Sequence, residues 1–242
     1  MLGEPWLHWI QMGSTATIEG VARPASPPFV VAHRAGNRLA DLHAAEREGS
    51  LLVEADVRLY RGRLEVRHLK SAGPLILWDR WRLAAPWRHR LRLEELLTAT
   101  SEDTGLMLDL KGPRRRLAEL VVEALRPHLG RRPLTVCARW GRLLEPFEGL
   151  PVRRVHSVGA RRQLDRLLAR AGDRPRLDGV AVHARLLDEH VAVELRRVAD
   201  LVITWPVNTP ERARELLRLG VDGLISDAAA AIVPALTADA SA

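Results

Sequence analysis

The segment Phe29–Arg34 (Phe-Val-Val-Ala-His-Arg) places the strongest constraint on how this chain folds. A short apolar run that contains β-branched residues is typical of a strand covered on both faces, as in a parallel sheet. The run ends abruptly in His33 and Arg34, where such a strand would leave the core. Many strands simply end in polar residues, but a histidine and an arginine on a rigid strand end also suit recognition of an anionic group.

Strand-like and helical segments alternate along the rest of the chain. The predicted strands cover residues 29–33, 51–57, 105–112, 134–139, 152–158, 178–184, 200–205 and 222–227, and the helices between them include 39–49, 114–129, 186–198 and 210–219. A barrel of eight βα units needs about 250 residues, which matches the 242 residues present. We therefore predict an α/β fold, a (β/α)8 TIM barrel. An open doubly wound sheet is the alternative, and the lack of a Gly-rich phosphate loop counts against it.

The domain boundaries follow from this pattern. Residues 29–230 form the predicted barrel, preceded by an extension over 1–28 and followed by a flexible alanine-rich tail over 231–242. Alternation around Gly62 predicts a hairpin ending at His68. Residues 69–92 are then expected to form a small, irregular insertion after the second strand, over the barrel mouth.

Charge and composition exclude some classes of function. The net charge of +7 comes mainly from arginines scattered along the chain, and aromatic residues make up only 4%. This favours a solvated basic surface over a nucleic-acid site with stacking aromatics. No apolar run approaches the ~20 residues of a membrane span, and no signal-peptide pattern is found. We therefore expect a cytoplasmic protein without nucleic-acid partners or stable membrane insertion. The single cysteine, Cys137, lies in an apolar run, and we expect its thiol to be buried and inert. The oligomeric state is left open.

Acidic side chains stand where two predicted strands end. Glu54 and Asp56 are two residues apart, which places both carboxylates on one face of a strand. Asp109 stands at the end of the next barrel strand, and strand ends converge in such a barrel. Three converging carboxylates repel one another unless a cation lies among them, and hard oxygen ligands suit Mg²⁺ or Ca²⁺. The alternative is a set of buried salt bridges with Arg34, Arg58 or Lys111.

The groups around these carboxylates are typical of phosphoryl chemistry. Arg34 and Lys111 could hold a phosphate, and a divalent ion could offset charge that develops on its oxygens. Lys111 is one of two lysines in an arginine-rich chain, and a compact ammonium fits a tight site differently from a planar guanidinium. His33 and His68 could act as base and acid. A serine hydrolase is disfavoured because no G-x-S-x-G motif occurs.

The order of these motifs resembles the glycerophosphodiester phosphodiesterase family over roughly residues 29–230. The segments that carry the resemblance are HRAG at 33–36, EAD at 54–56, RHL at 67–69, LDLKG at 108–112, TWPVNT at 204–209 and GVDGLISD at 220–227. The resemblance implies a metal-dependent barrel enzyme that hydrolyses glycerophosphodiesters to sn-glycerol 3-phosphate and an alcohol. By position it implies His33 and His68 as the acid–base pair, Glu54, Asp56 and Asp109 as metal ligands, Arg34 and Lys111 as phosphate ligands, and Trp205 as a residue of the pocket wall or of the strand-end core.

The chain also departs from the family pattern. Ala40-Asp41-Leu42 stands in place of Glu-Asn-Thr, Leu69 follows the second histidine in place of Asp, Asp109 replaces Glu, and Pro206 replaces Thr. An aspartate is one methylene shorter than a glutamate, which would weaken metal binding or draw the ion inward. Two alternatives therefore stay open. One is a weak or inactive barrel that binds phosphorylated ligands, and the other is a phosphodiesterase that acts on lysophospholipids.

Overall fold

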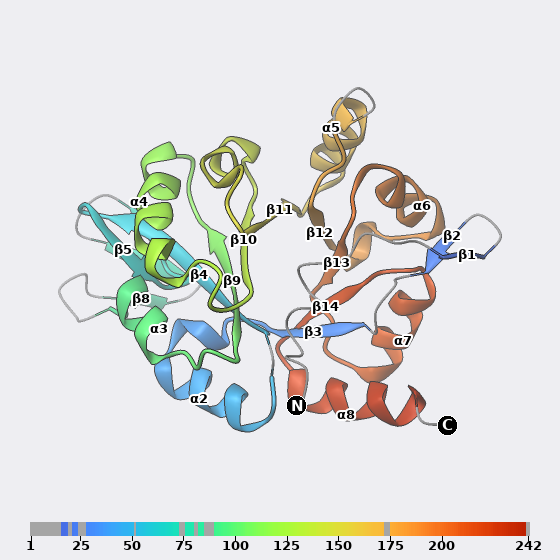
Figure 1. Cartoon of the computed structure of the whole chain (residues 1–242), viewed down its shortest axis with the longest axis horizontal. Coiled ribbons are helices and arrows are strands. Elements are labelled where there is room, and N and C mark those ends of the chain that lie inside the picture. The colour runs from blue at the N-terminus through green and yellow to red at the C-terminus, as the bar shows by residue number, and fades with distance from the viewer. Residues whose placement is uncertain are drawn as a thin grey trace.

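The computed structural model describes residues 16–18, 21–23, 28–50, 52–72, 76–79, 82–84, 90–171 and 175–240. Eight parallel strands form a closed barrel with helices around it (Figure 1). They are β3 (Phe29–Ala32), β4 (Leu52–Tyr60), β9 (Gly105–Leu110), β10 (Leu134–Ala138), β11 (Arg153–Val158), β12 (Gly179–His183), β13 (Val202–Trp205) and β14 (Gly223–Ser226). The strands follow one another in chain order, and β3 pairs with both β14 and β4 to close the barrel. The predicted fold is therefore confirmed.

Helices connect the strands on the outside of the barrel. They are α2 (Leu39–Arg47), α3 (Leu93–Ala99), α4 (Arg115–Leu125), α5 (Arg161–Ala171), α6 (Glu189–Val198), α7 (Pro210–Arg218) and α8 (Ala229–Ala240). Helix α4 shows why they form, because Leu117, Val121 and Leu125 recur every four residues and are all buried. Shorter 3-10 turns are η1 (Ala35–Asn37), η2 (Arg126–His128), η3 (Gly141–Leu143), η4 (Glu145–Phe147) and η5 (Ala184–Leu186).

The barrel interior is apolar in its middle and polar at one end. Each strand directs alternate residues inward, since the side-chain period of a strand is two. The inner cluster contains Val31, Leu52, Met107, Cys137, Val155, Ala181, Leu201, Ile203 and Ile225. Two residues beyond Val31, Leu52 and Met107 stand His33, Glu54 and Asp109. The functional candidates therefore lie one step above the core, at the carboxyl ends of the strands.

The hairpin after β4 forms as predicted. Strand β5 (Arg63–Val66) pairs antiparallel with β4, and the chain turns at Arg61 and Gly62, both with positive φ. The insertion contains more regular structure than predicted. Strands β6 (Lys70–Ala72), β7 (Ile76–Asp79) and β8 (Arg82–Ala84) form a separate antiparallel sheet.

The chain differs from prediction in two further places. The alternation of strands and helices predicts a short helix between the strands 134–139 and 152–158. The link from β10 to β11 consists instead of the turns η3 and η4, with Pro146 at the start of the second turn. The alanine-rich segment expected to be a flexible tail forms most of α8, and Ile232 in this helix is fully buried. Alanine favours helix, and an apolar contact is enough to dock it.

Before β3, the described residues form the short antiparallel pair β1 (Ala16–Ile18) and β2 (Val21–Arg23), and most of the predicted extension over 1–28 lies outside the described residues. Residues 241–242 of the predicted tail also lie outside them. Within the described ranges, every helix is too short or too polar to traverse a bilayer.

Gly36 is the position at which the turn η1 packs against β4. A Cβ at this position would lie 2.7 Å from the Ala55 Cβ and 3.1 Å from the Glu54 carbonyl oxygen. We expect Gly36→Ala to lower the free energy of unfolding by about 1–3 kcal/mol, because β4 cannot move away without strain. Denaturant unfolding would measure the loss. Gly159→Ala is the matched control, since its Cβ would meet its nearest neighbours at 3.5 Å. Equal stability of the two variants would contradict this account.

Candidate active site

Three carboxylates gather at the carboxyl end of the barrel. Glu54 and Asp56 project from β4 and are almost completely buried. Asp109 projects from β9, and the strand register places it directly opposite Asp56. One oxygen from each of the three lies within 4.8 Å of the others. The predicted convergence is thus confirmed, and it follows from the parallel pairing of the two strands.

Lys111 provides a positive charge within this cluster. Its Nζ lies 2.8 Å from an Asp56 oxygen and also contacts the Asp109 carboxylate. Burial alone would lower the pKa of Lys111, but the charges of Asp109, Asp56 and Glu54 outweigh it and raise the pKa. The ammonium therefore stays charged. The salt bridges considered as an alternative to a metal site are present, with one lysine facing three carboxylates.

Asp56 has the most hydrogen bonds of the three acids. Asn37 donates to its carboxylate at 2.8 Å and accepts from its backbone amide at 2.8 Å, and the His68 Nδ1 lies 3.2 Å from the same oxygen. Burial opposes ionisation of Asp56, but the hydrogen bonds from His68, Lys111 and Asn37, together with the Lys111 charge, lower its pKa well below the usual range. Asn37 was not predicted, because its role depends on the turn that brings it back over β4.

Glu54 and Asp109 are in a different electrostatic situation. The Glu54 carboxylate accepts a hydrogen bond from the Arg34 amide at 2.8 Å. Burial first, and then the Asp56 charge, raise the pKa of Glu54 well above its ordinary value. Burial also raises the pKa of Asp109, although Lys111 opposes the rise. Both acids would therefore be stabilised in their ionised form by a further cation nearby.

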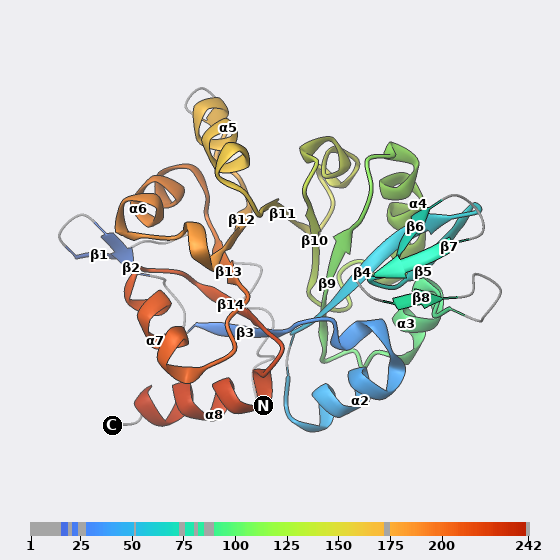
Figure 2. The same ribbon diagram turned by 180° about the vertical axis from the view of Figure 1, so that it is seen from behind.

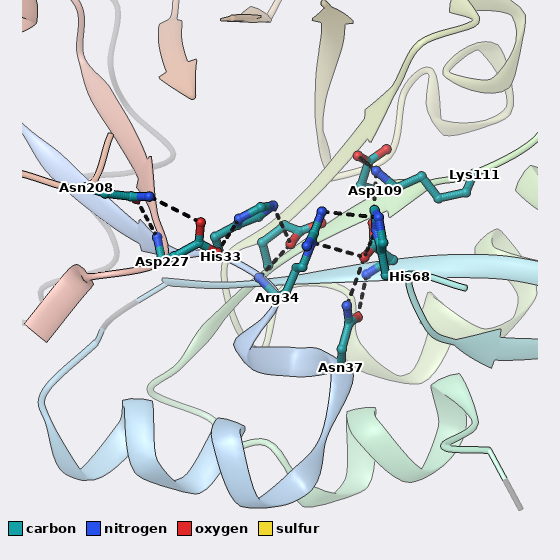
Figure 3. Close-up of polar contacts among 10 residues, drawn as sticks. His33, Arg34, Asn37, His68, Asp109, Lys111, Asn208 and Asp227 are labelled. Carbon is teal, nitrogen blue, oxygen red and sulfur yellow. Dashed lines mark hydrogen bonds and ion pairs between the residues drawn. The ribbon is translucent and has the colours of Figure 1, made fainter. Parts of the chain in front are cut away.

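His33 is oriented by residues from the far end of the chain. Its Nδ1 lies 2.7 Å from an Asp227 oxygen, and Asn208 in turn donates to the other Asp227 oxygen at 3.4 Å and accepts from the Asp227 amide at 3.0 Å (Figure 3). An ionised carboxylate only accepts, so Nδ1 carries the proton and Nε2 keeps its lone pair. Nε2 faces Glu54 at 4.0 Å. Burial lowers the pKa of His33, which favours the neutral ring.

Asp227 and Asn208 were not assigned roles from the sequence. Both lie in motifs that had been recognised, TWPVNT and GVDGLISD. The contact of Asp227 with His33 depends on the pairing of β14 with β3, which joins residues almost two hundred positions apart.

His68 follows β5 and faces the cluster from the opposite side to His33 (Figure 3). Its Nδ1 is directed at the Asp56 carboxylate, and its Nε2 lies 3.3 Å from a terminal nitrogen of Arg34. The Arg34 Nε lies 3.8 Å from the Asp56 carboxylate. Both predicted histidines thus share one arrangement, in which a carboxylate contacts Nδ1 and another side chain of the site, Glu54 or Arg34, lies near Nε2.

A cavity of about 460 Å³ adjoins the cluster and is lined in part by Asp109, Lys111 and Trp205. The Trp205 ring lies 4.7 Å from the His183 ring, and its Nε1 donates to the Ala181 carbonyl at 3.4 Å. Trp205 also packs against the inner barrel cluster. It therefore combines the two roles considered for it, pocket wall and strand-end core.

Asn37 allows the network to be tested without an activity assay. Asn37→Ala removes two hydrogen bonds from the buried Asp56, and we expect unfolding free energy to fall by about 1–3 kcal/mol. Denaturant unfolding would check this. Asn208→Ala is a milder comparison, because the Asp227 carboxylate that it contacts is half exposed. If Asn37→Ala lowers the unfolding free energy no more than Asn208→Ala does, the central role of Asp56 in this network is contradicted.

Comparison with known proteins agrees with this fold. No protein-family model and no curated protein matches the sequence. Solved structures do match. A phosphodiesterase from Oleispira antarctica, solved with the product sn-glycerol-3-phosphate, is 21% identical at a TM-score of 0.71, covering 87% of this chain and 97% of that one. A glycerophosphodiester phosphodiesterase from Thermotoga maritima is 22% identical at a TM-score of 0.67, covering 85% and 96%.

A third solved structure gives the same result. A glycerophosphodiester phosphodiesterase from Parabacteroides distasonis is 19% identical at a TM-score of 0.66, covering 89% of this chain and 100% of that one. At these identities the likeness concerns the fold, and it extends over nearly the full length of each structure. The chain therefore has the barrel fold of solved glycerophosphodiester phosphodiesterases, as its sequence motifs led us to expect.

Proposed function

We propose that this protein is a metal-dependent phosphodiesterase that hydrolyses glycerophosphodiesters to sn-glycerol 3-phosphate and an alcohol. The observation that carries the proposal is the arrangement at the barrel mouth. Three carboxylates lie within 4.8 Å of one another, between two histidines that are each held through Nδ1 by a carboxylate. The fold shared with solved phosphodiesterases supports the same reading.

The donor set suits a divalent ion with a preference for oxygen. Glu54, Asp56 and Asp109 would hold Mg²⁺ or Ca²⁺, with water completing the coordination. The Lys111 ammonium group contacts two of the three carboxylates, those of Asp56 and Asp109. The raised pKa values of Glu54 and Asp109 indicate that a further positive charge would stabilise their ionised forms. A bound ion would polarise the phosphoryl group and offset charge developing on its oxygens.

Cationic side chains of the chain would hold the phosphate. The Arg34 guanidinium lies between Asp56 and His68, and Lys111 lies beside the cavity. Both are within the site, so the oxygens of a bound diester would replace part of their present contacts with carboxylates. Hydrogen bonds from charged donors to a phosphate are short and strong, and they fix the phosphorus between the two histidines.

The two imidazoles would divide the proton transfers. His33, with Nδ1–H directed at Asp227 and a pKa lowered by burial, is suited to take a proton at Nε2 from the attacking group. His68 would then deliver a proton to the leaving alkoxide, since an acid and a base are needed on opposite sides of the phosphorus. Trp205 would form one wall of the substrate cavity.

One alternative is favoured by a specific observation. The contacts of Lys111 with Asp56 and Asp109 already satisfy part of the carboxylate cluster. A barrel that binds phosphorylated ligands without turning them over would need no metal there. The loss of the Glu-Asn-Thr motif pointed the same way, but Asn37 provides a buried polar support to Asp56 from another position.

Metal dependence is the first prediction to test. Purified protein is assayed with sn-glycero-3-phosphocholine and bis(p-nitrophenyl) phosphate, first with EDTA and then with excess Mg²⁺ or Ca²⁺. We expect turnover with one of the ions and none with EDTA. Glu54→Gln should lower kcat/KM by about a hundredfold or more, since removal of even an indirect metal contact costs 10–100-fold. Glu119→Gln, at a half-exposed position of α4 away from the carboxylate cluster, is the matched control.

Thermal unfolding distinguishes the outcomes. Stabilisation by the ion in wild type and its loss in Glu54→Gln would place the metal on the carboxylates independently of activity. Folded protein without turnover under any metal, but stabilised by inorganic phosphate or sn-glycerol 3-phosphate, would support the binding barrel in place of the enzyme.

Asp227→Asn tests the orientation of His33. An amide can present its NH₂ to Nδ1 and so favour the wrong tautomer. We expect kcat to fall by about ten- to a hundredfold, within the range of acid–base contributions, with little change in KM. His33→Ala should be at least as severe with the fold intact. Asp165→Asn, on the exposed face of α5, serves as the control, and equal rates for Asp227→Asn and Asp165→Asn would refute the role of Asp227.

A further inference from the structure

The substrate cavity continues into a larger groove. The groove has a volume of about 670 Å³ and lies between the turns η3 and η4 on one side and α5 on the other. Both views show α5 standing apart from the turns that follow β10 (Figures 1 and 2). The cavity and the groove share the residues Arg139, Trp140, Ser157 and Gln163. A ligand seated on Lys111 could therefore extend into the groove without leaving the protein surface.

Each acidic residue of this groove lies within ion-pair distance of an arginine, and Glu148 shares its arginine with Asp178. The Glu145 carboxylate lies 2.6 Å from Arg115. The Asp178 carboxylate lies 2.9 Å from Arg154, with a second bond at 3.0 Å, and Glu148 lies 3.9 Å from the same arginine. Paired in this way, these acids contribute little negative charge toward a ligand.

Three arginines of the groove have no such carboxylate partner among the described residues. The Arg139 guanidinium lies over the Trp140 ring, 5.6 Å from its centroid. Arg142 donates to the Pro113 carbonyl at 2.8 Å, and Arg166 donates to the Arg162 carbonyl at 3.1 Å. Among the described residues, no carboxylate lies within ion-pair range of these three. The groove therefore carries surplus positive charge at these three positions.

We propose that the enzyme selects glycerophosphodiesters whose alcohol carries a second anionic group, such as a further phosphate. This inference rests on the proposed function. The glycerol arm is uncharged and gains nothing from a row of arginines, so the surplus charge can discriminate only on the other arm. An alcohol that bears a phosphate would extend from Lys111 past Arg139 and Trp140 toward Arg142 and Arg166. A cationic alcohol such as choline would be repelled along the same path.

The test compares three diesters that share one glycerol arm. They are sn-glycero-3-phosphocholine, glycerophosphoglycerol and 1,3-bis(sn-glycero-3-phospho)glycerol, with a cationic, a neutral and an anionic alcohol. At an ionic strength of about 0.01 M we expect kcat/KM for the anionic diester to exceed that for the neutral one by about tenfold or more, and the choline diester to be slowest. At about 0.15 M the preference should shrink, because the Debye length falls from about 30 to 8 Å.

A triple variant tests whether the three arginines cause the preference for the anionic diester. It carries Arg139→Gln, Arg142→Gln and Arg166→Gln. The ratio of kcat/KM for the anionic and neutral diesters should fall about tenfold, as a few-fold contribution from each partly exposed charge would give. Arg218→Gln, at the exposed end of α7, removes one charge elsewhere and should leave the ratio unchanged. Thermal unfolding confirms that the variants are folded.

The outcomes separate this inference from the proposed function. Turnover of all three diesters at similar kcat/KM in low salt, or an unchanged ratio in the triple variant, would overturn the charge selection and leave the phosphodiesterase activity standing. No turnover of any diester with either metal would overturn both.

Discussion

The carboxylate of Asp56 accepts a hydrogen bond from Asn37, and the Asp56 amide returns one, which ties the turn after β3 to β4. The rest of the structure depends on this contact, because the barrel is closed at the same place. Among the described residues, the pairing of β3 with β4 consists of one residue pair, Ala32 and Val53. Beyond it, the Arg34 amide donates to the Glu54 side chain, so acidic side chains replace the carbonyl acceptors of an ordinary ladder. The buried carboxylates therefore lie at the place where the barrel closes.

Glu54 and Asp56 show how unevenly the chain distributes positive charge. They are two residues apart on one strand and equally buried, yet their pKa values are displaced in opposite directions. Lys111, His68 and Asn37 all face Asp56, whereas Glu54 receives one backbone amide and lies 4.0 Å from His33. The fold thus compensates the charge of Asp56 by its own residues more fully than the charge of Glu54. An uncompensated negative charge of this kind suits a cation-binding site, because carboxylates whose charge is already fully paired would attract a cation only weakly.

The strands could be predicted because most of them are short apolar runs that alternate with helical segments, and the two-residue spacing of Glu54 and Asp56 indicated that they share a face. The partners Asn37 and Asp227 could not be predicted, since their contacts depend on a turn and on strand pairing across almost the whole chain. The helix α8 was missed because an alanine-rich segment has no strong apolar pattern, although burial of Ile232 holds it in place. The link between β10 and β11 forms two 3-10 turns, and Pro146 at the start of the second is a residue that disfavours a continuous helix.

The turns η3 and η4 belong to a part of the barrel that contributes none of the three carboxylates or the two histidines. The carboxylates, the histidines and their supports come from β3, β4, β9 and the segments beside β5, β13 and β14. The groove is built instead by the turns after β10, by β11 and by α5. Loops in that arc can lengthen, shorten or exchange charges without moving the acids, because rigid neighbouring strands fix the acids independently. The barrel thereby places the carboxylate cluster and the groove on different sets of elements, so that the groove can change its charge while the cluster keeps its geometry.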